Sequence, residues 1–112
     1  MINIKAGRVG GNSQGVAIHG CCQQQGIPVW CGGMLENGVG RASNLALASL
    51  PNFVLPGDIS ATDRYYRNDI TYEEFVLNSD STITVPDKLG LGITINHGEV
   101  KKESLRSEIF MC

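Results

Sequence analysis

The stretch GIPVWCGGMLENGVGRASNLALASLPNFVLPGD, residues 26–58, contains two strand patterns with a helix pattern between them. Residues 27–34, IPVWCGGM, are rich in β-forming side chains and end in two glycines and a methionine, which predicts a short strand followed by a turn. Residues 40–51, GRASNLALASLP, predict a helix that Pro51 ends, because the residue before a proline avoids helical backbone angles. Residues 52–58, NFVLPGD, predict another strand. The short connections indicate parallel strands covered by helices, an α/β fold.

The same alternation of strand and helix begins at the N-terminus. Residues 2–5, INIK, place the two isoleucines on one face of a short strand and leave Lys5 as its last residue. A helix is expected to follow, with Asn12 or Ser13 capping its first turn, and to run to about Gln25 before a glycine ends it. Its expected apolar positions are Val16, Ile18 and Cys22.

The segment after residue 70 has a different pattern. Residues 73–86, EEFVLNSDSTITVP, predict a β-hairpin that turns near Asn78 to Ser81. Residues 90–95, GLGITI, predict a further strand, and residues 98–110, GEVKKESLRSEIF, predict a polar surface helix or an irregular tail.

The composition is that of a globular chain. The 112 residues are 42% hydrophobic and 18% charged, with a net charge of −2, which argues against disorder and against nucleic acid as a partner. No apolar run approaches the roughly 20 residues that cross a bilayer, so no membrane partner is expected. The first residues lack the pattern of a signal peptide, which predicts a cytoplasmic protein.

The four cysteines fit this location. Cys21 and Cys22 are adjacent, Cys31 ends a strand and Cys112 is the last residue. Because this spacing contains neither a C-x-x-C pair nor a zinc pattern, free thiols that serve in packing are expected.

Lys5 is the residue that most needs a functional explanation. Active sites of parallel α/β folds gather where the carboxyl ends of strands meet the following loops, and Lys5 lies at such an end. The turns at residues 32–34 and 56–58 would lie on the same face, so three loops meet there. A lone lysine at a strand end is nonetheless more often a solvated charge. The glycines of GRVGG, residues 7–11, lack the spacing of a phosphate loop and indicate a tight turn.

Three motifs resemble one known family. They are NIKAGRVGG at residues 3–11, GIPVWCGGMLENGVGRASNLALASLPNF at residues 26–53 and LPGDISATDRYY at residues 55–66. Together they resemble the C-terminal part of the o-succinylbenzoate synthase and N-acylamino acid racemase family, in the muconate lactonizing subgroup of the enolase superfamily. The resemblance implies that residues 1–70 form strands six to eight of a (β/α) TIM-type barrel. Residues 71–112 would form a hairpin-containing tail that packs on a missing capping domain, so the chain is expected to be a fragment.

The same resemblance implies a set of site residues. Lys5 would be one of two lysines that face each other across the substrate, each aimed at the carbon next to a carboxylate. Arg8 matches an arginine in members that also racemise N-acylamino acids, where it would place positive charge near Lys5. The residues that would contact the substrate are Gly33, Met34, Leu35 and Tyr65.

The chemistry implied by the resemblance is proton removal next to a carboxylate. A divalent cation must hold the carboxylate while an amine moves the proton, because the product of deprotonation is an enediolate dianion. The family takes its three metal carboxylates from strands three to five, so Mg²⁺ would be a cofactor of the full-length enzyme with no ligand in this chain. Asp58 and Asp63 are therefore assigned to turns and caps.

Two functions follow as expectations. The first is a fragment of a magnesium-dependent lyase that forms o-succinylbenzoate from a small-molecule carboxylate for menaquinone synthesis, with N-acylamino acid racemisation as a second or substitute activity. The alternative is a non-catalytic structural remnant. Alone, the chain is expected to be inactive and to self-associate through exposed strand edges, with Asn3, Val29 and Cys31 meeting water on the opened inner face.

Overall fold

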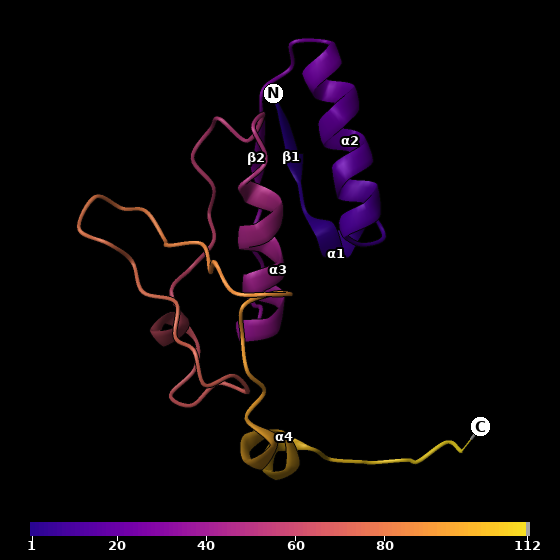
Figure 1. Ribbon diagram of the computed structural model, residues 1–112, viewed down its shortest axis with the longest axis vertical. Helices are drawn as coiled ribbons and strands as arrows, with labels where there is room; N and C mark the ends of the chain where they lie inside the picture. The colour runs from indigo at the N-terminus through magenta and orange to yellow at the C-terminus, as the bar shows by residue number, and fades with distance from the viewer. Residues whose placement is uncertain (112) are drawn as a thin grey trace.

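The computed structural model describes residues 1–111 and contains a parallel strand pair covered by helices (Figure 1). Strand β1 (Ile2–Ile4) pairs in parallel with β2 (Val29–Cys31), so that Ile2 lies opposite Val29 and Ile4 opposite Cys31. Helix α2 (Asn12–Gln24) lies between them in the chain, as a parallel pair requires. The α/β class predicted from the alternation of patterns is confirmed.

The third strand expected over residues 52–58 is reduced to a single bridge. Phe53 pairs in parallel with Val29, so the chain runs in the expected direction. The next backbone hydrogen bond, from Leu55 N to Val29 O, is long at 3.4 Å. The following donor is Asp58 N, which contacts Cys31 O at 3.4 Å. It lies three residues after Leu55 rather than two, so the two-residue period of a strand is lost and a regular ladder does not form.

Two glycines determine where α2 begins. A four-residue helix, α1 (Ala6–Val9), follows β1, and Gly10 and Gly11 then have φ angles of 97° and 104°, which glycine adopts without steric cost. This confirms the predicted tight turn. Gly11 is the N-cap of α2 and no side chain caps it. The prediction that Asn12 or Ser13 caps this helix was wrong, because the turn brings both residues inside it.

Helix α3 (Gly38–Ala48) begins earlier than its apolar pattern indicated. Asn37 caps it, and Asn37 Oδ1 accepts hydrogen bonds from Val39 N at 3.1 Å and Gly40 N at 3.3 Å. The helix ends three residues before Pro51, in agreement with the predicted stop.

The main core lies between the strands and the helices, and its buried members are Ile4, Ala6, Cys22, Val29 and Leu47. Val16, which was expected to be apolar core, is 48% exposed. His19 is buried instead: its ring stacks on Phe53 with centroids 5.5 Å apart, and its Nε2 accepts a hydrogen bond from Asn52 N at 3.1 Å. The helical repeat explains why His19 is buried and Val16 is not, since positions 15, 19 and 22 share the face of α2 that packs inward.

Val29 and Cys31 do not meet water. They are 0% and 2% exposed, because β2 directs both side chains toward the helices. Val29 belongs to the main core, and the Cys31 thiol lies 3.7 Å from the carbonyl oxygen of Asn44 in α3. The prediction that these two residues are exposed was wrong. Asn3, on the opposite face of β1, is exposed as expected.

The segment after residue 70 packs on α3. Phe75 is 5% exposed and lies in a second buried cluster with Ala42 and Leu45. The predicted hairpin is present at its turn, where Leu77 pairs antiparallel with Ile83. The tail is thus anchored by Phe75 and by the partly buried side chains of Ile83, Leu91 and Ile93 that pack against the same cluster, rather than by a regular sheet.

The strand expected over residues 90–95 is also reduced to a bridge, between Thr71 and Ile95. Gly90 and Gly92 both have a φ of 69°. This left-handed conformation interrupts an extended strand, and it explains why the apolar pattern did not produce one.

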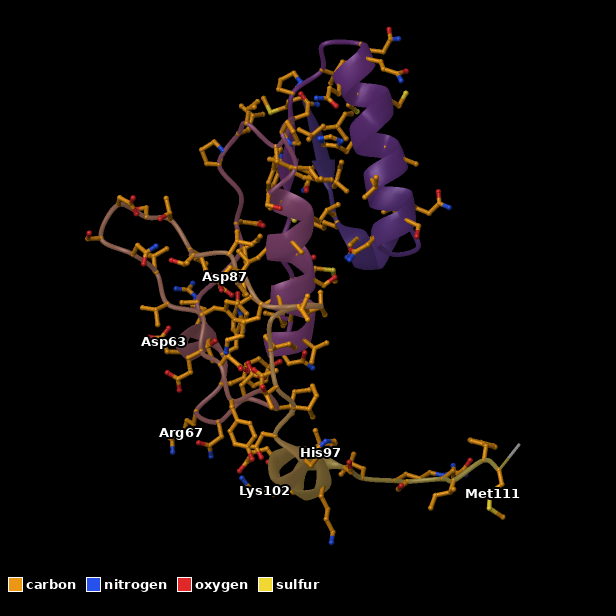
Figure 2. The ribbon with its side chains drawn as sticks, viewed as in Figure 1. Asp63, Arg67, Asp87, His97, Lys102 and Met111 are labelled. Carbon is orange, nitrogen blue, oxygen red and sulfur yellow. The ribbon has the colours of Figure 1, made fainter. Side chains whose placement is uncertain are left out.

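A polar helix, α4 (His97–Glu103), follows and confirms the predicted surface helix. Figure 2 shows His97 and Lys102 on this helix and Met111 near the end of an extended segment that leaves the body of the chain. Residues 104–111 are exposed. Among the helices of residues 1–111, none is long and apolar enough to cross a membrane.

Candidate functional site

Lys5 lies directly after β1 and reaches across to the loop that follows β2. Its Nζ donates a hydrogen bond to Gly33 O at 2.7 Å. Gly32 makes room for this contact, since a Cβ atom there would lie 2.6 Å from Lys5 Nζ and 2.3 Å from Asn3 Oδ1. The structure therefore brings together the carboxyl ends of two parallel strands, as the sequence predicted, and fixes the lysine side chain between them.

Gly33 is held from its other side as well. Its amide donates to Asp58 Oδ1, and a Cβ atom on Gly33 would lie 2.8 Å from Asp58 O. The space that was expected to admit a substrate is thus filled by the chain's own backbone on the side where the Cβ would lie. Asp58 has the turn-stabilising role assigned to it, and a substrate contact by Gly33 stays a prediction.

Met34 and Leu35 extend from the loop between β2 and α3. Their side chains are 42% and 72% exposed. The main chain around them is bonded: Met34 N donates to Glu36 Oε2 at 2.7 Å, and the Tyr66 hydroxyl donates to Leu35 O at 3.1 Å. These contacts place two exposed apolar side chains on a fixed backbone.

Tyr65 and Arg8 complete the predicted set. Tyr65 directly follows the 3-10 helix Thr62–Arg64 and is 44% exposed. Because Tyr66 bonds to Leu35 O, Tyr65 lies next in sequence to an anchor of the Met34–Leu35 loop. Arg8 lies in α1, one turn after Lys5, where its side chain is exposed. Its predicted effect on Lys5 stays a prediction.

The pKa of the Cys31 thiol reflects burial and the charges at this end of the sheet. Burial, reinforced by the negative charges of Glu36 and Asp58, raises the pKa of the Cys31 thiol from 9.0 to about 11, while Lys5 acts in the opposite direction. The thiol is therefore neutral near pH 7. Together with Cys21 and Cys22 it is free, as predicted, and Cys112 lies outside the described residues.

A buried ion pair behind the loop was not predicted. Arg41 Nη1 lies 3.3 Å from Asp69 Oδ2, and the two side chains are 1% and 2% exposed. Arg41 also donates to Glu36 O at 2.9 Å and contacts Thr62 Oγ1 at 3.5 Å, while Asp69 Oδ1 accepts from Gly38 N at 2.9 Å. The available signal was a charged residue in the apolar stripe of α3, next to Ala42 and one turn before Leu45.

The described residues do not fit a magnesium site. Within residues 1–111, no three His, Cys, Asp or Glu side chains gather closely enough to hold a metal ion. Asp63 lies in the first turn of the 3-10 helix and is exposed. This agrees with its assignment to a turn, but it is not a cap, because Ala61 is the N-cap and no side chain caps this helix.

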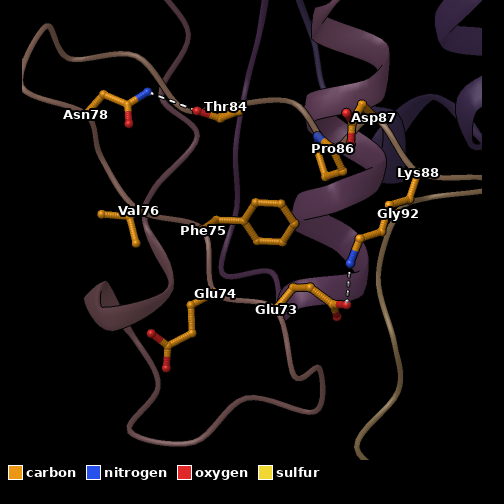
Figure 3. Close-up of a pocket in the computed structure, with 10 residues that line it drawn as sticks. All are labelled: Glu73, Glu74, Phe75, Val76, Asn78, Thr84, Pro86, Asp87, Lys88 and Gly92. Atoms are coloured by element: carbon orange, nitrogen blue, oxygen red, sulfur yellow. Dashed lines mark hydrogen bonds and ion pairs between the residues drawn. The ribbon is translucent and has the colours of Figure 1, made fainter.

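A pocket of about 300 Å³ lies elsewhere, in the tail (Figure 3). Phe75 and Pro86 line it, and Lys88 Nζ lies 3.7 Å from Glu73 Oε1 beside them. A hydrogen bond from Thr94 N holds the pKa of Glu73 below its usual range. None of the predicted site residues lines this pocket, and the candidate site remains at the carboxyl end of the strands.

Comparison with known sequences agrees with the resemblance noted above. A chain named N-succinylamino acid racemase, from Amycolatopsis sp, is 59% identical over 93 residues, which is 83% of this chain and 25% of that one. A chain named o-succinylbenzoate synthase, from Enterococcus faecalis (strain ATCC 700802 / V583), is 48% identical over 108 residues, 96% of this chain and 29% of that one. The chain thus spans under a third of the length of these relatives.

Solved structures share the fold. An enolase-superfamily member from Enterococcus faecalis V583 superposes with a TM-score of 0.84 at 50% identity, covering 90% of this chain and 27% of that one. A dipeptide epimerase from Cytophaga hutchinsonii, complexed with Mg and the dipeptide D-Ala-L-Val, has a TM-score of 0.77 at 23% identity, covering 89% and 27%.

The family assignment rests on most of the chain. Residues 1–100 match the sequence profile of the family described as "Enolase C-terminal domain-like". This span includes the strand pair, the Lys5 contact and the loops around it. The chain therefore belongs to the enolase C-terminal domain-like family, as part of an enolase-superfamily TIM-type barrel.

Proposed function

We propose that this chain supplies one of the proton-transferring lysines of an o-succinylbenzoate synthase, with N-acylamino acid racemisation as a second or substitute activity. The observation that carries the proposal is the placement of Lys5 Nζ, 2.7 Å from Gly33 O at the joined ends of two parallel strands. The names of relatives at 59% and 48% identity support the choice of reaction.

The contacts of Lys5 suit a group that moves a proton. A lysine ammonium has three donor positions, and Gly33 O takes one of them, which orients Nζ and leaves the others for a ligand. The aliphatic stem passes over Gly32, where no side chain competes for the space. Positioned amines of this kind speed proton transfer by about 10²–10⁴-fold. We assign Lys5 Nζ to the carbon next to the substrate carboxylate, with Arg8 as the neighbouring positive charge.

The remaining residues of the proposed site are apolar or small. Met34, Leu35 and Tyr65 would form walls around the rest of a small-molecule carboxylate, and Gly33 would lie against it. Their exposed fractions of 42%, 72% and 44% leave side-chain surface for such contacts.

Magnesium dependence is part of the proposal. It is supported by family membership and by the Mg present in the Cytophaga hutchinsonii epimerase. Since residues 1–111 do not fit a metal site, the ligands would have to come from residues that this chain does not contain. We accordingly propose that residues 1–70 are strands six to eight of a barrel and that residues 71–112 pack on a capping domain. The exposed apolar side chains of Leu105, Ile109 and Phe110 support that packing.

A cytoplasmic location belongs to the same proposal. Cys21, Cys22 and Cys31 are free, which suits a reducing compartment. The second candidate function is a structural remnant with no turnover of its own.

A chimeric enzyme separates the two functions. The matching 108-residue segment of the Enterococcus faecalis synthase would be replaced by this chain, and o-succinylbenzoate formation followed by absorbance. We expect magnesium-dependent turnover that Lys5→Ala removes and that Lys88→Ala, at a side chain 69% exposed, leaves unchanged. A folded but inactive chimera would favour the structural remnant.

A further inference from the structure

The loop that presents Met34 and Leu35 is bonded at almost every residue. Exposed loops are ordinarily more mobile than the elements they connect. Here Gly33 is held by Lys5 and Asp58, and the amide of Met34 and the carbonyl of Leu35 each have a partner. The backbone of this loop is held by hydrogen bonds, while the apolar side chains of Met34 and Leu35 extend outward. This arrangement suits a surface that contacts a ligand.

Glu36 joins this loop to α3. Its Oε2 accepts from Met34 N at 2.7 Å, its Oε1 accepts from Asn44 Nδ2 at 2.9 Å, and its carbonyl oxygen accepts from Arg41 Nη2 at 2.9 Å. Arg41 is fully buried against Asp69. Both carboxylate oxygens thus accept hydrogen bonds from within the chain, and Asn44 and Arg41 connect the loop to α3.

Tyr66 joins the loop to the segment that carries Tyr65. Its hydroxyl donates to Leu35 O at 3.1 Å across 31 residues of sequence. The neighbouring ring of Tyr65 is 44% exposed. One hydrogen bond therefore connects the two apolar surfaces that the proposed function assigns to substrate contact.

We propose that Tyr66 and Glu36 are positioning residues that hold the Met34–Leu35 loop in place relative to the Tyr65 segment, and so set which acyl or side-chain group the site accepts. A wall ordered in advance loses little conformational entropy when a ligand binds, so it discriminates between groups that fit and groups that do not. This inference rests on the proposed function.

The first measurement is hydrogen exchange of the Gly33 and Met34 amides, which donate to Asp58 and Glu36, in the 112-residue chain. Tyr66→Phe removes one hydroxyl and should speed their exchange about fivefold, the factor that one hydrogen bond of ordinary strength supplies. Tyr72→Phe is the matched control, since Tyr72 is 66% exposed. Unchanged exchange in Tyr66→Phe would overturn the positioning role.

The second measurement is selectivity in the chimeric enzyme, as the ratio of kcat/KM for the N-succinyl and N-acetyl derivatives of one amino acid. We expect Tyr66→Phe to lower this ratio severalfold, chiefly through KM, and Tyr72→Phe to leave it unchanged. Glu36→Gln should act in the same direction, because its amide nitrogen would face one of the two donors that the carboxylate now accepts from.

The outcomes separate the two claims. Faster exchange with an unchanged selectivity ratio would overturn the specificity role. An unmodified chimera that folds without turnover would overturn the proposed function and, with it, the specificity claim, whatever the exchange data show.

Discussion

Replacing Arg41 by methionine tests how far the buried ion pair holds the tail on α3. In the structure Arg41 and Asp69 are 1% and 2% exposed and lie 3.3 Å apart. Arg41→Met keeps an aliphatic side chain of similar length but leaves Asp69 Oδ2 without its charged partner. Asp69 Oδ1 would keep its bonds from Gly38 N at 2.9 Å and Ile70 N at 2.7 Å.

The expected loss in the free energy of unfolding is large for a small domain. Breaking one side of a buried pair costs about 3–5 kcal/mol, against a total stability of about 5–15 kcal/mol. Because Asp69 retains two backbone donors, we expect the lower end, about 3 kcal/mol, which corresponds to more than 100-fold faster exchange of protected amides.

Hydrogen exchange at the Gly38, Thr62 and Phe75 amides measures this loss locally. These amides donate to Asp69, to Phe75 O and to Thr62 Oγ1. The double variant Arg41→Met with Asp69→Asn removes both charges, while the Asn side-chain oxygen can still accept from the two amides. It should recover most of the protection. Equal exchange in Arg41→Met and the unmodified chain would refute the reasoning, as would a double variant less stable than the single one.

Three further predictions concern other parts of the account. In the chimeric enzyme, Arg8→Gln should slow solvent deuterium exchange on the Lys5 face of an N-acylamino acid more than on the opposite face, and equal slowing on both faces would leave Arg8 only a structural role. Burial and the charges of Glu36 and Asp58 raise the pKa of Cys31 to about 11, so the protein should lose up to about 2–3 kcal/mol of stability as pH rises from about 9 to 11. Thermal unfolding measured against pH should show this loss in the unmodified chain and not in Cys31→Ala. Light scattering should show the isolated 112-residue chain associating through the free edge of β1, and a compact monomer would contradict that prediction.

Local sequence patterns predicted the parts of the fold that depend on local chemistry. The βαβ order, the turn at Gly10 and Gly11 and the placement of Lys5 at a strand end all follow from backbone preferences and hydrophobic periodicity, and the structure contains each of them. The resemblance to one family added the site residues, and the structure brings Lys5 and Gly33 into contact.

The parts that could not be predicted depend on contacts between distant residues. Arg41 and Asp69 are 28 positions apart in the sequence, and nothing in the local sequence around either residue shows that they pair. His19 replaces Val16 in the core because Phe53 offers a stacking partner and Asn52 a donor. The strand over residues 52–58 is cut short although its composition favours one, because its donors to β2, Leu55 N and Asp58 N, are three residues apart and the two-residue period of a ladder is lost.

The role of Lys5 in proton transfer is the central claim, and isotope exchange tests it most directly. In D₂O, the chimeric enzyme should exchange the α-proton of an N-succinylamino acid and form both enantiomers, whereas Lys5→Ala should abolish racemisation and lower o-succinylbenzoate formation, with racemase turnover reduced by at least about 10²-fold. Lys88→Ala should match the unmodified enzyme. Unchanged racemase turnover in Lys5→Ala would remove Lys5 from the mechanism.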